Sequence, residues 1–361
     1  MKLQSIAILF ALMILSSVIA AQGGDIVLSP DHPDQYVVKK GDTLWDIAEK
    51  FLRDPWRWTE IWEDNKQIEN PHLIYPGDVI YLTEKDGRPV LNMRRRDPDG
   101  GTDLSANGPD GALVKVTPTI REGELSTPIP TIPMSVIRPF LSKPRVVTND
   151  MLDDAAYIVS FQDGHLLGGT DSIVYVRNLD DASDDFDIVR KGKPYRHHRT
   201  GEILGYEALY VGKAQLLRRG DPATFKLLKS ERDARIGDRL IRGGTEKGLF
   251  EIQPHVPETD IRGAIIRVVD GVTQIGQHDI VVIDLGSQEG IEPGHVLSIY
   301  QSSNIVRDTV INDAGERIRL PEEKAGFLMV FRSFRHVSYG LVMSATRALH
   351  LSDTVRTPPL Y

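Results

Sequence analysis

Two short polar turns, one at each end of a stretch of fewer than fifty residues, constrain this chain more than any other feature of its sequence. The first stretch reads YVVKKGDTLWDIAEKF, Tyr36 to Phe51, and the second reads NPHLIYPGDVIYL, Asn70 to Leu82. In the first, a short apolar strand runs into Gly-Asp-Thr and then a helix. In the second, Asn-Pro and Pro-Gly turns lead into an alternating strand. The order predicts a compact β-α-α-β module in which the two turns lie side by side.

The first helix carries its own start signal. Thr43-Leu44-Trp45-Asp46 fits the Ser/Thr-x-x-Asp/Glu pattern, in which the hydroxyl accepts from the first turn and the acid reaches back. Four apolar residues then form a single stripe at helical spacing: Leu44, Ile47, Ala48 and Phe51. The pattern predicts a helix that buries one face against the module.

A second helix is expected after Asp54-Pro55, with Asp54 as the cap and Pro55 at the first helical position. Its inner face is expected to carry Trp58, Ile61, Trp62 and Asn65. The strands at Tyr36–Val38 and Asp78–Leu82 are expected to pair, with both helices on one face of the pair.

These segments resemble the LysM module, the carbohydrate-binding fold of peptidoglycan- and chitin-binding proteins. The resemblance rests on YVVKKGDTLWDIAEKF, IWEDN and NPHLIYPGDVIYL, and it covers almost all of residues 36–82. One departure is visible, because LRDPWRWTE, Leu52 to Glu60, replaces the shorter and less aromatic link between helices that is usual in the family. The shape of one side of the module is therefore left open.

The resemblance implies a groove for N-acetylglucosamine between the two turns. An N-acetylated sugar needs backbone N–H and C=O partners at fixed spacing and an apolar floor for its methyl group. The residues implied in glycan binding are Gly41, Asp42, Thr43, Leu44, Asn70, Pro71, His72, Leu73 and Ile74. The alternative is that Asp42, Thr43 and the prolines serve only as caps and turns.

All four tryptophans of the chain lie in this module. Core packing is expected for Trp58 and Trp62. Trp56, between Pro55 and Arg57, is the better candidate for an exposed contact.

The N-terminal residues predict export. Residues 1–21 read as a signal peptide, with Lys2 ahead of an apolar core and small residues that allow cleavage at Ala20 or Ala21. An uncleaved anchor is the alternative. No other apolar run is long enough to cross a membrane. The chain has no cysteine, which excludes a lipoprotein acylated on cysteine and fits an envelope protein with sizeable cores. The expected location is the periplasm.

The remaining chain divides by composition into a linker, a docking segment and a β-rich region. Residues 83–116 are expected to be a flexible linker, because DPDGGTDLSANGPDG has almost nothing to bury. Residues 117–149 are expected to be a docking segment, in which IPMSVIRPFLSKP forms a short helix against the next domain. From there on, short β-branched and aromatic runs predict antiparallel sheets or barrels.

An internal repeat indicates that the β-rich region is duplicated. GYEALY at 205–210 is similar to GFLMVF at 326–331, Ala223–Leu227 to Val337–Leu341, and Ile236–Leu240 to Leu351–Val355. The hairpin signal Thr200–Glu202 corresponds to Ala314–Glu316. The predicted units are 150–245 and 275–361, and 246–274 is expected to bridge them with its own strand at Ala264–Val269. The expected fold class is therefore α+β multidomain: a βααβ LysM module, a flexible linker and a mostly β, internally duplicated barrel-like region.

The sequence shows no motif of an enzyme, and none is expected. There is no cysteine nucleophile, no H-E-x-x-H and no G-x-S-x-G. His197 and His198 form the only close histidine pair, and on a strand their side chains would point to opposite faces. They are interpreted as an exposed turn, and no cofactor or metal is expected. DDASDDFD, Asp180 to Asp187, is interpreted as a solvated acidic loop. The net charge of −8 shows no footprint of a nucleic-acid binder.

As a whole, the chain resembles the LysM-containing secretin-associated proteins of type IV pilus systems (the TsaP family). Its C-terminal part is similar to the C-terminal domain of the flagellar protein FlgT. The residues that carry this are GYEALYVGKAQLL, ARIGDRLI, VVIDLGSQEGIEPGHVLSIY and GFLMVFRSFRHVSYGLVMSATRALHLSDTVR. The resemblance implies a periplasmic adaptor that binds peptidoglycan through LysM and meets an outer-membrane secretin ring through its β-domain. The alternatives are a LysM-anchored hydrolase or amidase and a general envelope scaffold.

Overall fold

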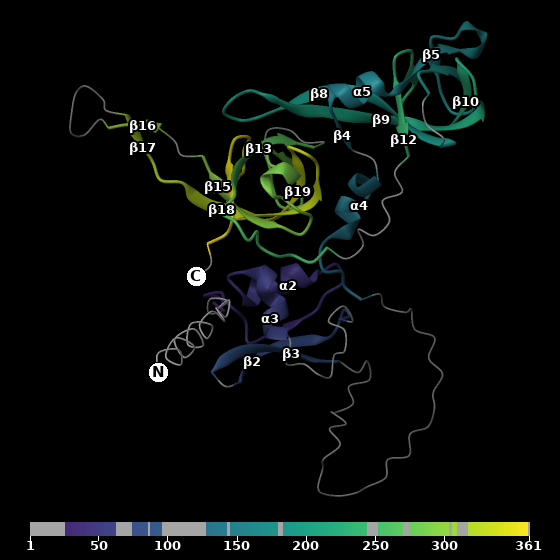
Figure 1. Ribbon diagram of the computed structural model, residues 1–361. Coiled ribbons are helices and arrows are strands. Elements are labelled where there is room, and N and C mark those ends of the chain that lie inside the picture. Colours follow the sequence, from purple (N-terminus) through teal and green to yellow (C-terminus); the bar gives the residue numbers. More distant parts are fainter. Residues whose placement is uncertain are drawn as a thin grey trace, which may run out of the picture.

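The computed structural model describes most of the chain as three compact parts joined by a helical segment (Figure 1). A small α+β module is followed by two β-barrels. The predicted signal peptide, most of the predicted linker, the Asn70–Leu73 turn and the Ala314–Glu316 hairpin lie outside the described residues. The described residues are 26–62, 74–85, 87–95, 128–142, 145–179, 183–243, 252–269, 274–302, 305–308 and 317–359.

The N-terminal module pairs its first and last predicted strands, as expected. β1 (Gln35–Val37) runs antiparallel to β2 (Val79–Lys85), and Tyr36 lies opposite Ile80. β2 also pairs with β3 (Arg88–Arg94), which falls in the segment 83–116 that was assigned to a linker. The sheet therefore has three strands, because the chain turns back at Gly87, whose φ is 75°, and Val90 and Leu91 add buried side chains.

The helices of the module begin where the sequence predicts. α2 (Leu44–Phe51) starts at Thr43, whose hydroxyl accepts from the Asp46 amide while the Asp46 carboxylate accepts from the Thr43 amide. This reciprocal pair satisfies two backbone donors at the helix start. A short 3₁₀ turn, η1 (Pro55–Arg57), leads into α3 (Trp58–Trp62). Asp54 precedes η1 but makes no capping hydrogen bond, which corrects that part of the prediction.

The first barrel has six strands in a closed ring. In chain order the six are β5, β7, β8, β9, β10 and β12, and around the ring they run β5–β7–β10–β9–β8–β12, with β12 pairing back to β5. β4 (Arg145–Val147) adds to the outside of β9, after which Thr148 caps α5 (Asn149–Asp154). The ring strands are β5 (Ala156–Phe161), β7 (Ile173–Arg177), β8 (Asp185–Arg196), β9 (Ile203–Arg218), β10 (Ala223–Ser230) and β12 (Arg239–Arg242). The short elements η2 (Gln162–Gly164), β6 (Leu167–Gly168) and β11 (Ala234–Arg235) lie between them.

The second barrel repeats this order strand for strand. Its ring runs β13–β14–β19–β18–β15–β20, so both barrels order their six strands 1-2-5-4-3-6. A two-stranded ribbon, β16 (Ile305–Arg307) with β17 (Arg317–Arg319), extends from the hairpin between strands three and four. The ring strands are β13 (Arg262–Val268), β14 (Ile280–Ile283), β15 (Val296–Gln301), β18 (Glu323–Ser333), β19 (Ser338–Ala345) and β20 (Thr354–Arg356), with η3 (Ser287–Glu289) after β14.

Irregularities in the strands repeat as well, and they fix the alignment of the two units. Gly212 pairs with Ile188 and Ser230, and Gly326 pairs with Ile299 and Ala345. A register shift directly follows the Ile188 and Ile299 pairings, and another lies one pair away from the Ser230 and Ala345 pairings. The structural equivalent of Gly326 is therefore Gly212. The sequence comparison had matched Gly326 with Gly205, seven positions away, and the structure corrects it.

A buried aspartate turn marks the last strand of each barrel. Asp238 accepts from the Arg235 amide in the first barrel, and Asp353 accepts from the His350 amide in the second. The backbone amide of Ile158 donates to the backbone carbonyl of Asp238, and that of Ile265 donates to the backbone carbonyl of Asp353. Ile236–Leu240 and Leu351–Val355 are thus structural equivalents, as the sequence repeat indicates.

The predicted bridge 246–274 does not stand between the two units. β13 pairs with both β14 and β20, so it is the first strand of the second barrel. Without β13 the ring could not close, because β14 and β20 would each be left with an open edge. The connection between the barrels therefore lies at residues 243–261, between β12 and β13.

The strands of the second barrel are buried on both faces. One face fills the barrel with residues such as Val281 and Val330. The other face, which we call the covered outer face, carries Val282, Val296, Phe327, Met329, Phe331, Tyr339, Leu341 and Met343. This explains why GFLMVF and YGLVM read as continuous apolar runs and not as alternating ones.

Three other parts of the chain cover this outer face. Trp45 and Trp56 approach from the N-terminal module, and Tyr195 from the first barrel. The third part is the docking segment, which forms α4 (Met134–Ser142) and buries Ile132 and Ile137 in the same cluster. Within the predicted docking segment, α4 thus docks as a helix, but on the second barrel and the N-terminal module together (Figure 1).

The long β8–β9 hairpin of the first barrel joins the two barrels (Figure 1). The hydroxyls of Tyr195 and Tyr339 lie 3.2 Å apart in a buried contact. Arg267 pairs with Glu207 at 3.3 Å and lies over the Tyr195 ring. Burial raises the pKa of both tyrosines, so both remain neutral hydroxyls.

Within the described part of the chain, no helix combines the length and the apolar character that a membrane span requires.

Candidate functional site: the groove of the N-terminal module

The turn between β1 and α2 forms the first wall of the predicted groove. Gly41 has a φ of 100°, which favours glycine at this turn. Asp42 accepts from the Lys39 amide and from the Tyr36 hydroxyl. Burial and this hydrogen bond to Asp42 raise the pKa of Tyr36 to about 12. Thr43 and Leu44 are buried at the start of the helix.

The second wall is described from Ile74 onward. Ile74 is fully buried and belongs to the same apolar cluster as Leu44. The turn that follows is closed by Asp78, which accepts from the Tyr75 amide, and by Gly77 at a φ of 102°. The predicted site residues Asn70, Pro71, His72 and Leu73 lie outside the described residues. Of the predicted site residues, the structure brings Leu44 and Ile74 into one apolar cluster, and Gly41, Asp42 and Thr43 form the turn directly before Leu44.

A segment of the same chain lies between the two walls. The amides of Leu44 and Trp45 donate to the carbonyls of Pro130 and Thr131, at 3.0 and 3.2 Å. From the other side, the Ile129 amide donates to the Ile74 carbonyl at 2.8 Å. Ile129 is 5% exposed and packs in the cluster that contains Leu44 and Ile74. We call Pro128–Ile132 the groove segment.

Sequence reasoning missed the groove segment. The sequence places these residues in the docking segment, because the apolar residues of IPMSVIRPFLSKP predict a short helix against the next domain. The signal that could have identified it is the run Pro128-Ile129-Pro130-Thr131-Ile132-Pro133, in which three prolines in six residues favour an extended chain whose carbonyls are not used in secondary structure.

Trp56 is not an exposed contact, which corrects the prediction. It is 4% exposed, and its ring centre lies 5.0 Å from that of Phe327 in an edge-to-face arrangement. The Trp45 ring lies 6.5 Å away on its other side. The unusual link Leu52–Glu60 thus builds the side of the module that meets the second barrel, whereas Trp58 and Trp62 pack inside the module as expected.

Comparison with known proteins agrees with this geometry. Residues 36–83 match the LysM domain family. A stretch of 66 residues is 41% identical to "Uncharacterized protein YqbP" of Bacillus subtilis (strain 168), covering 16% of this chain and 30% of that protein. A stretch of 71 residues is 39% identical to "SpoIVD-associated factor A" of the same organism, covering 20% of this chain and 16% of that protein. The chain spans less than a third of the length of either curated relative.

The chain is therefore a LysM-containing protein. A LysM domain implies peptidoglycan binding and association with the cell wall. The family match ends at residue 83, so it defines the module that carries the groove and does not extend to the two barrels.

Two ionisable side chains lie at the contact between the LysM domain and the second barrel. Asp54 is 3% exposed, and burial raises the pKa of its carboxyl even though Lys324, Arg57 and Arg53 lower it. Burial likewise lowers the pKa of Lys324 to about 8, against the opposing effect of Asp54. The charged forms of Asp54 and Lys324 therefore destabilise the contact between the LysM domain and the second barrel.

We expect Asp54→Asn to stabilise the protein near pH 7.5 and to have little effect near pH 4. The folded-state pKa of Asp54 lies above its ordinary value, so the folded state binds more protons in that window. The ionised Asp54 carboxylate destabilises the folded state. This destabilisation is absent at low pH, where the group is protonated, and it grows as pH rises through the folded-state pKa. The melting temperature of variant minus wild type, measured from pH 4 to 8, should rise with pH. The control is Asp163→Asn, at an exposed aspartate. The prediction would be contradicted if the melting-temperature difference of Asp54→Asn did not change with pH and equalled that of the control.

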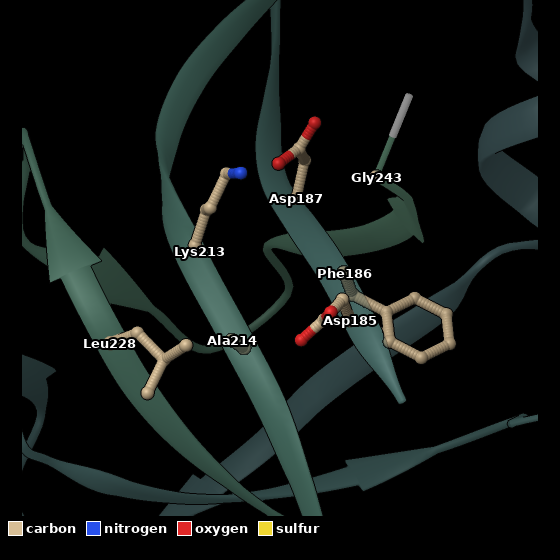
Figure 2. Close-up of a pocket in the computed structure, with 7 residues that line it drawn as sticks. All are labelled: Asp185, Phe186, Asp187, Lys213, Ala214, Leu228 and Gly243. Carbon is tan, nitrogen blue, oxygen red and sulfur yellow. The ribbon is translucent and has the colours of Figure 1, made fainter. Parts of the chain in front are cut away.

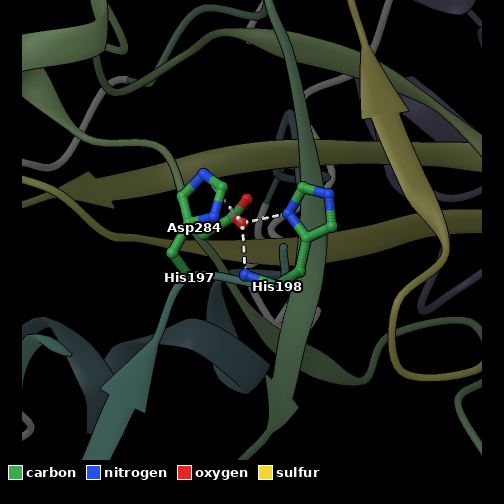
Figure 3. A group of neighbouring side chains, drawn as sticks. All are labelled: His197, His198 and Asp284. Atoms are coloured by element: carbon green, nitrogen blue, oxygen red, sulfur yellow. Dashed lines mark hydrogen bonds and ion pairs between the residues drawn. The ribbon is translucent and has the colours of Figure 1, made fainter. Parts of the chain in front are cut away.

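His197 and His198 gather around one buried carboxylate instead of pointing apart (Figure 3). His198 Nδ1 lies 2.5 Å from Asp284 Oδ2, and the His198 amide donates to the same oxygen at 3.1 Å. The two rings stack with centres 5.0 Å apart. The pair lies at a turn beyond β8, as interpreted from the sequence, so the strand alternation does not apply and both side chains face the same carboxylate.

This group joins the two barrels, and it is also the place in the described chain where three metal-ligating side chains converge. Its ligand atoms all lie within 4.8 Å of one another. Two imidazoles and a carboxylate are a suitable ligand set for zinc or another transition metal. In the present arrangement they form a hydrogen-bonded clamp, since Asp284 also accepts from the Ala264 amide at 2.7 Å.

Asp284→Asn is expected to lower the free energy of unfolding by about 2–3 kcal/mol, because an amide cannot accept on both sides and leaves a buried donor unpaired. For a domain of this size the melting temperature should fall by about 5–10 °C. Asp184→Asn, at an exposed ion pair with Arg219, is the control and should change it by less than about 2 °C. If the two substitutions lower the melting temperature equally, the clamp does not contribute to the stability of the protein.

A small pocket on the first barrel is a poor candidate for the glycan site. It has a volume of about 180 Å³ and lies against β8 and β9 (Figure 2). Ligand pockets usually measure about 300–1,000 Å³, so it is too small for a saccharide chain. Its lining residues are Asp185, Phe186, Asp187, Lys213, Ala214, Leu228 and Gly243.

Proposed function

We propose that this protein is a non-catalytic periplasmic adaptor that holds N-acetylglucosamine in peptidoglycan through its LysM domain and aligns an outer-membrane secretin of a type IV pilus through its barrels. The observation that carries the glycan half is the LysM groove, which presents helix-start amides without a partner inside the helix on one wall and the Ile74 carbonyl on the other. The secretin half rests on the resemblance of the whole chain to the secretin-associated family.

The β16–β17 ribbon supports a protein partner for the barrels. It projects from the second barrel, away from the LysM domain (Figure 1). Its apolar side chains are exposed, with Ile305 at 57% and Ile318 at 41%, and exposed Arg307, Arg317 and Arg319 lie among them. A two-stranded ribbon is marginal on its own, and exposed apolar side chains on it are typical of an interaction site. We propose that the ribbon binds an acidic, partly apolar face of the secretin.

A bridging experiment tests the adaptor. Purified secretin rings are mixed with peptidoglycan sacculi, with and without this protein, and the sacculi are sedimented. Secretin is expected in the pellet only when the protein is present. Arg307→Glu with Arg319→Glu should abolish secretin capture while the protein itself still sediments. Arg235→Glu, on the exposed surface of the first barrel, is the control. If the ribbon substitutions leave secretin capture unchanged, the ribbon is not the surface that binds the secretin.

The alternative is a cell-wall hydrolase or amidase anchored by its LysM domain. The His197–His198–Asp284 group is where such an enzyme would hold a metal ion. Release of soluble fragments from sacculi, lost in His198→Ala, would favour the enzyme over the adaptor. A scaffold with no pilus link would sediment with sacculi and capture an envelope protein other than the secretin.

A further inference from the structure

We propose that the groove segment is an internal occupant of the LysM glycan site, and that an N-acetylated glycan binds by displacing it. This inference rests on the proposed glycan function of the groove. It adds that the site is closed by the chain itself and that its opening is linked to the contact between the LysM domain and the second barrel.

The groove segment uses the hydrogen-bonding groups that an N-acetyl sugar needs. Leu44 and Trp45 are the first two residues of α2, so their amides have no partner within the helix. They donate instead to the carbonyls of Pro130 and Thr131. On the opposite wall the Ile74 carbonyl accepts from the Ile129 amide. A peptide group is a secondary amide, as is the acetamido group of N-acetylglucosamine, so each can take the place of the other.

The apolar floor is taken as well. Ile129 is 5% exposed and packs in the cluster of Leu44 and Ile74. An acetamido methyl group would need the same floor. The groove segment already occupies the amide donors, the carbonyl acceptor and the apolar floor. A glycan and the groove segment therefore cannot both occupy the described part of the groove.

The groove segment continues directly into the contact with the second barrel. Ile132, one residue beyond Thr131, and Ile137 of α4 are fully buried with Trp45, Trp56 and the covered outer face. The Phe140 carbonyl accepts from Arg332 of β18 at 3.1 Å. Displacement of the segment by glycan would thus strain the anchor of α4. Linkage requires the converse, so a partner that loosens this contact would raise the affinity for glycan.

Closure lowers the apparent affinity of the groove by the fraction of molecules that are open. Ile129→Ser removes the buried side chain and is expected to tighten binding of tri-N-acetylchitotriose about tenfold or more, since burial of an aliphatic side chain of this size shifts an equilibrium by at least that factor. Pro130→Gly keeps the buried Ile129 side chain and frees the backbone next to it, so we expect about a two- to fivefold gain. Ile236→Ser, at an exposed isoleucine, is the matched control.

Titration calorimetry on the full chain, with hydrogen exchange at the Leu44 and Trp45 amides, tests the proposal. Wild type should protect both amides, Ile129→Ser should expose them, and the affinity for tri-N-acetylchitotriose should rise in the order wild type, Pro130→Gly, Ile129→Ser. Exposed amides in Ile129→Ser with unchanged affinity would overturn the internal competition and leave the glycan function intact. Absence of binding by all the proteins would overturn the glycan function itself, and the segment would then be a permanent part of the core.

Discussion

Replacing Gly326 by alanine is expected to lower the free energy of unfolding by about 3 kcal/mol. A Cβ at this position would lie 2.1 Å from the Ser344 carbonyl oxygen and 3.2 Å from the Ala345 Cα. Both are backbone atoms of the neighbouring strand, which cannot move without breaking the ring between β18 and β19. The melting temperature of the barrels should fall by about 6–12 °C.

The same substitution in the first barrel should behave alike. Gly212 occupies the equivalent position, and a Cβ there would lie 2.1 Å from the Lys229 carbonyl oxygen. Gly169→Ala is the matched control, because no heavy atom lies within 4 Å of its added Cβ. Differential scanning calorimetry should show large losses for Gly212→Ala and Gly326→Ala and little change for the control. A loss in only one barrel would contradict the structural equivalence of the two glycines.

Trp56→Ala is expected to release the LysM domain from the second barrel. Truncating a buried tryptophan costs about 3–5 kcal/mol, and here the loss falls on the contact with Phe327. Because this contact joins two folded parts, both should stay folded while they separate. Small-angle scattering should show a larger radius of gyration, and circular dichroism should be unchanged.

Two further variants make the test of docking specific. Trp56→Phe keeps an aromatic ring against Phe327 and should retain most of the compact form. Phe327→Ala removes the partner, so its effect combined with Trp56→Ala should be much smaller than the sum of the two single effects. Additive losses, or an unchanged radius in Trp56→Ala, would contradict the docking described for this side of the LysM domain.

The local structure of the LysM domain could be read from sequence because its signals lie close together in the chain. The Thr43–Asp46 capping pair, the apolar stripe of α2 and the pairing of β1 with β2 each depend on residues a few positions apart or on one alternation pattern. The same holds for the last strand of each barrel, where the turns before Asp238 and Asp353 gave the right alignment.

The features that sequence reasoning missed depend on contacts between distant segments. Trp56 looked like a surface residue because its partner, Phe327, lies far along the chain. The match of Gly326 with Gly205 followed the apolar residues after each glycine, whereas the structural match depends on where neighbouring strands come close. Nothing near Ile129 in sequence identifies Ile74 as its partner, so the occupied groove could only be seen once the chain was folded.

Co-sedimentation of the full chain with purified peptidoglycan sacculi tests the central claim most directly. The account predicts that the protein sediments with sacculi, that Ile129→Ser sediments at lower sacculus concentration, and that soluble tri-N-acetylchitotriose releases both without fragments appearing in the supernatant. If both proteins stay in the supernatant at every sacculus concentration, or if the sugar fails to release them, the LysM groove is not the wall-binding site and the adaptor account is wrong.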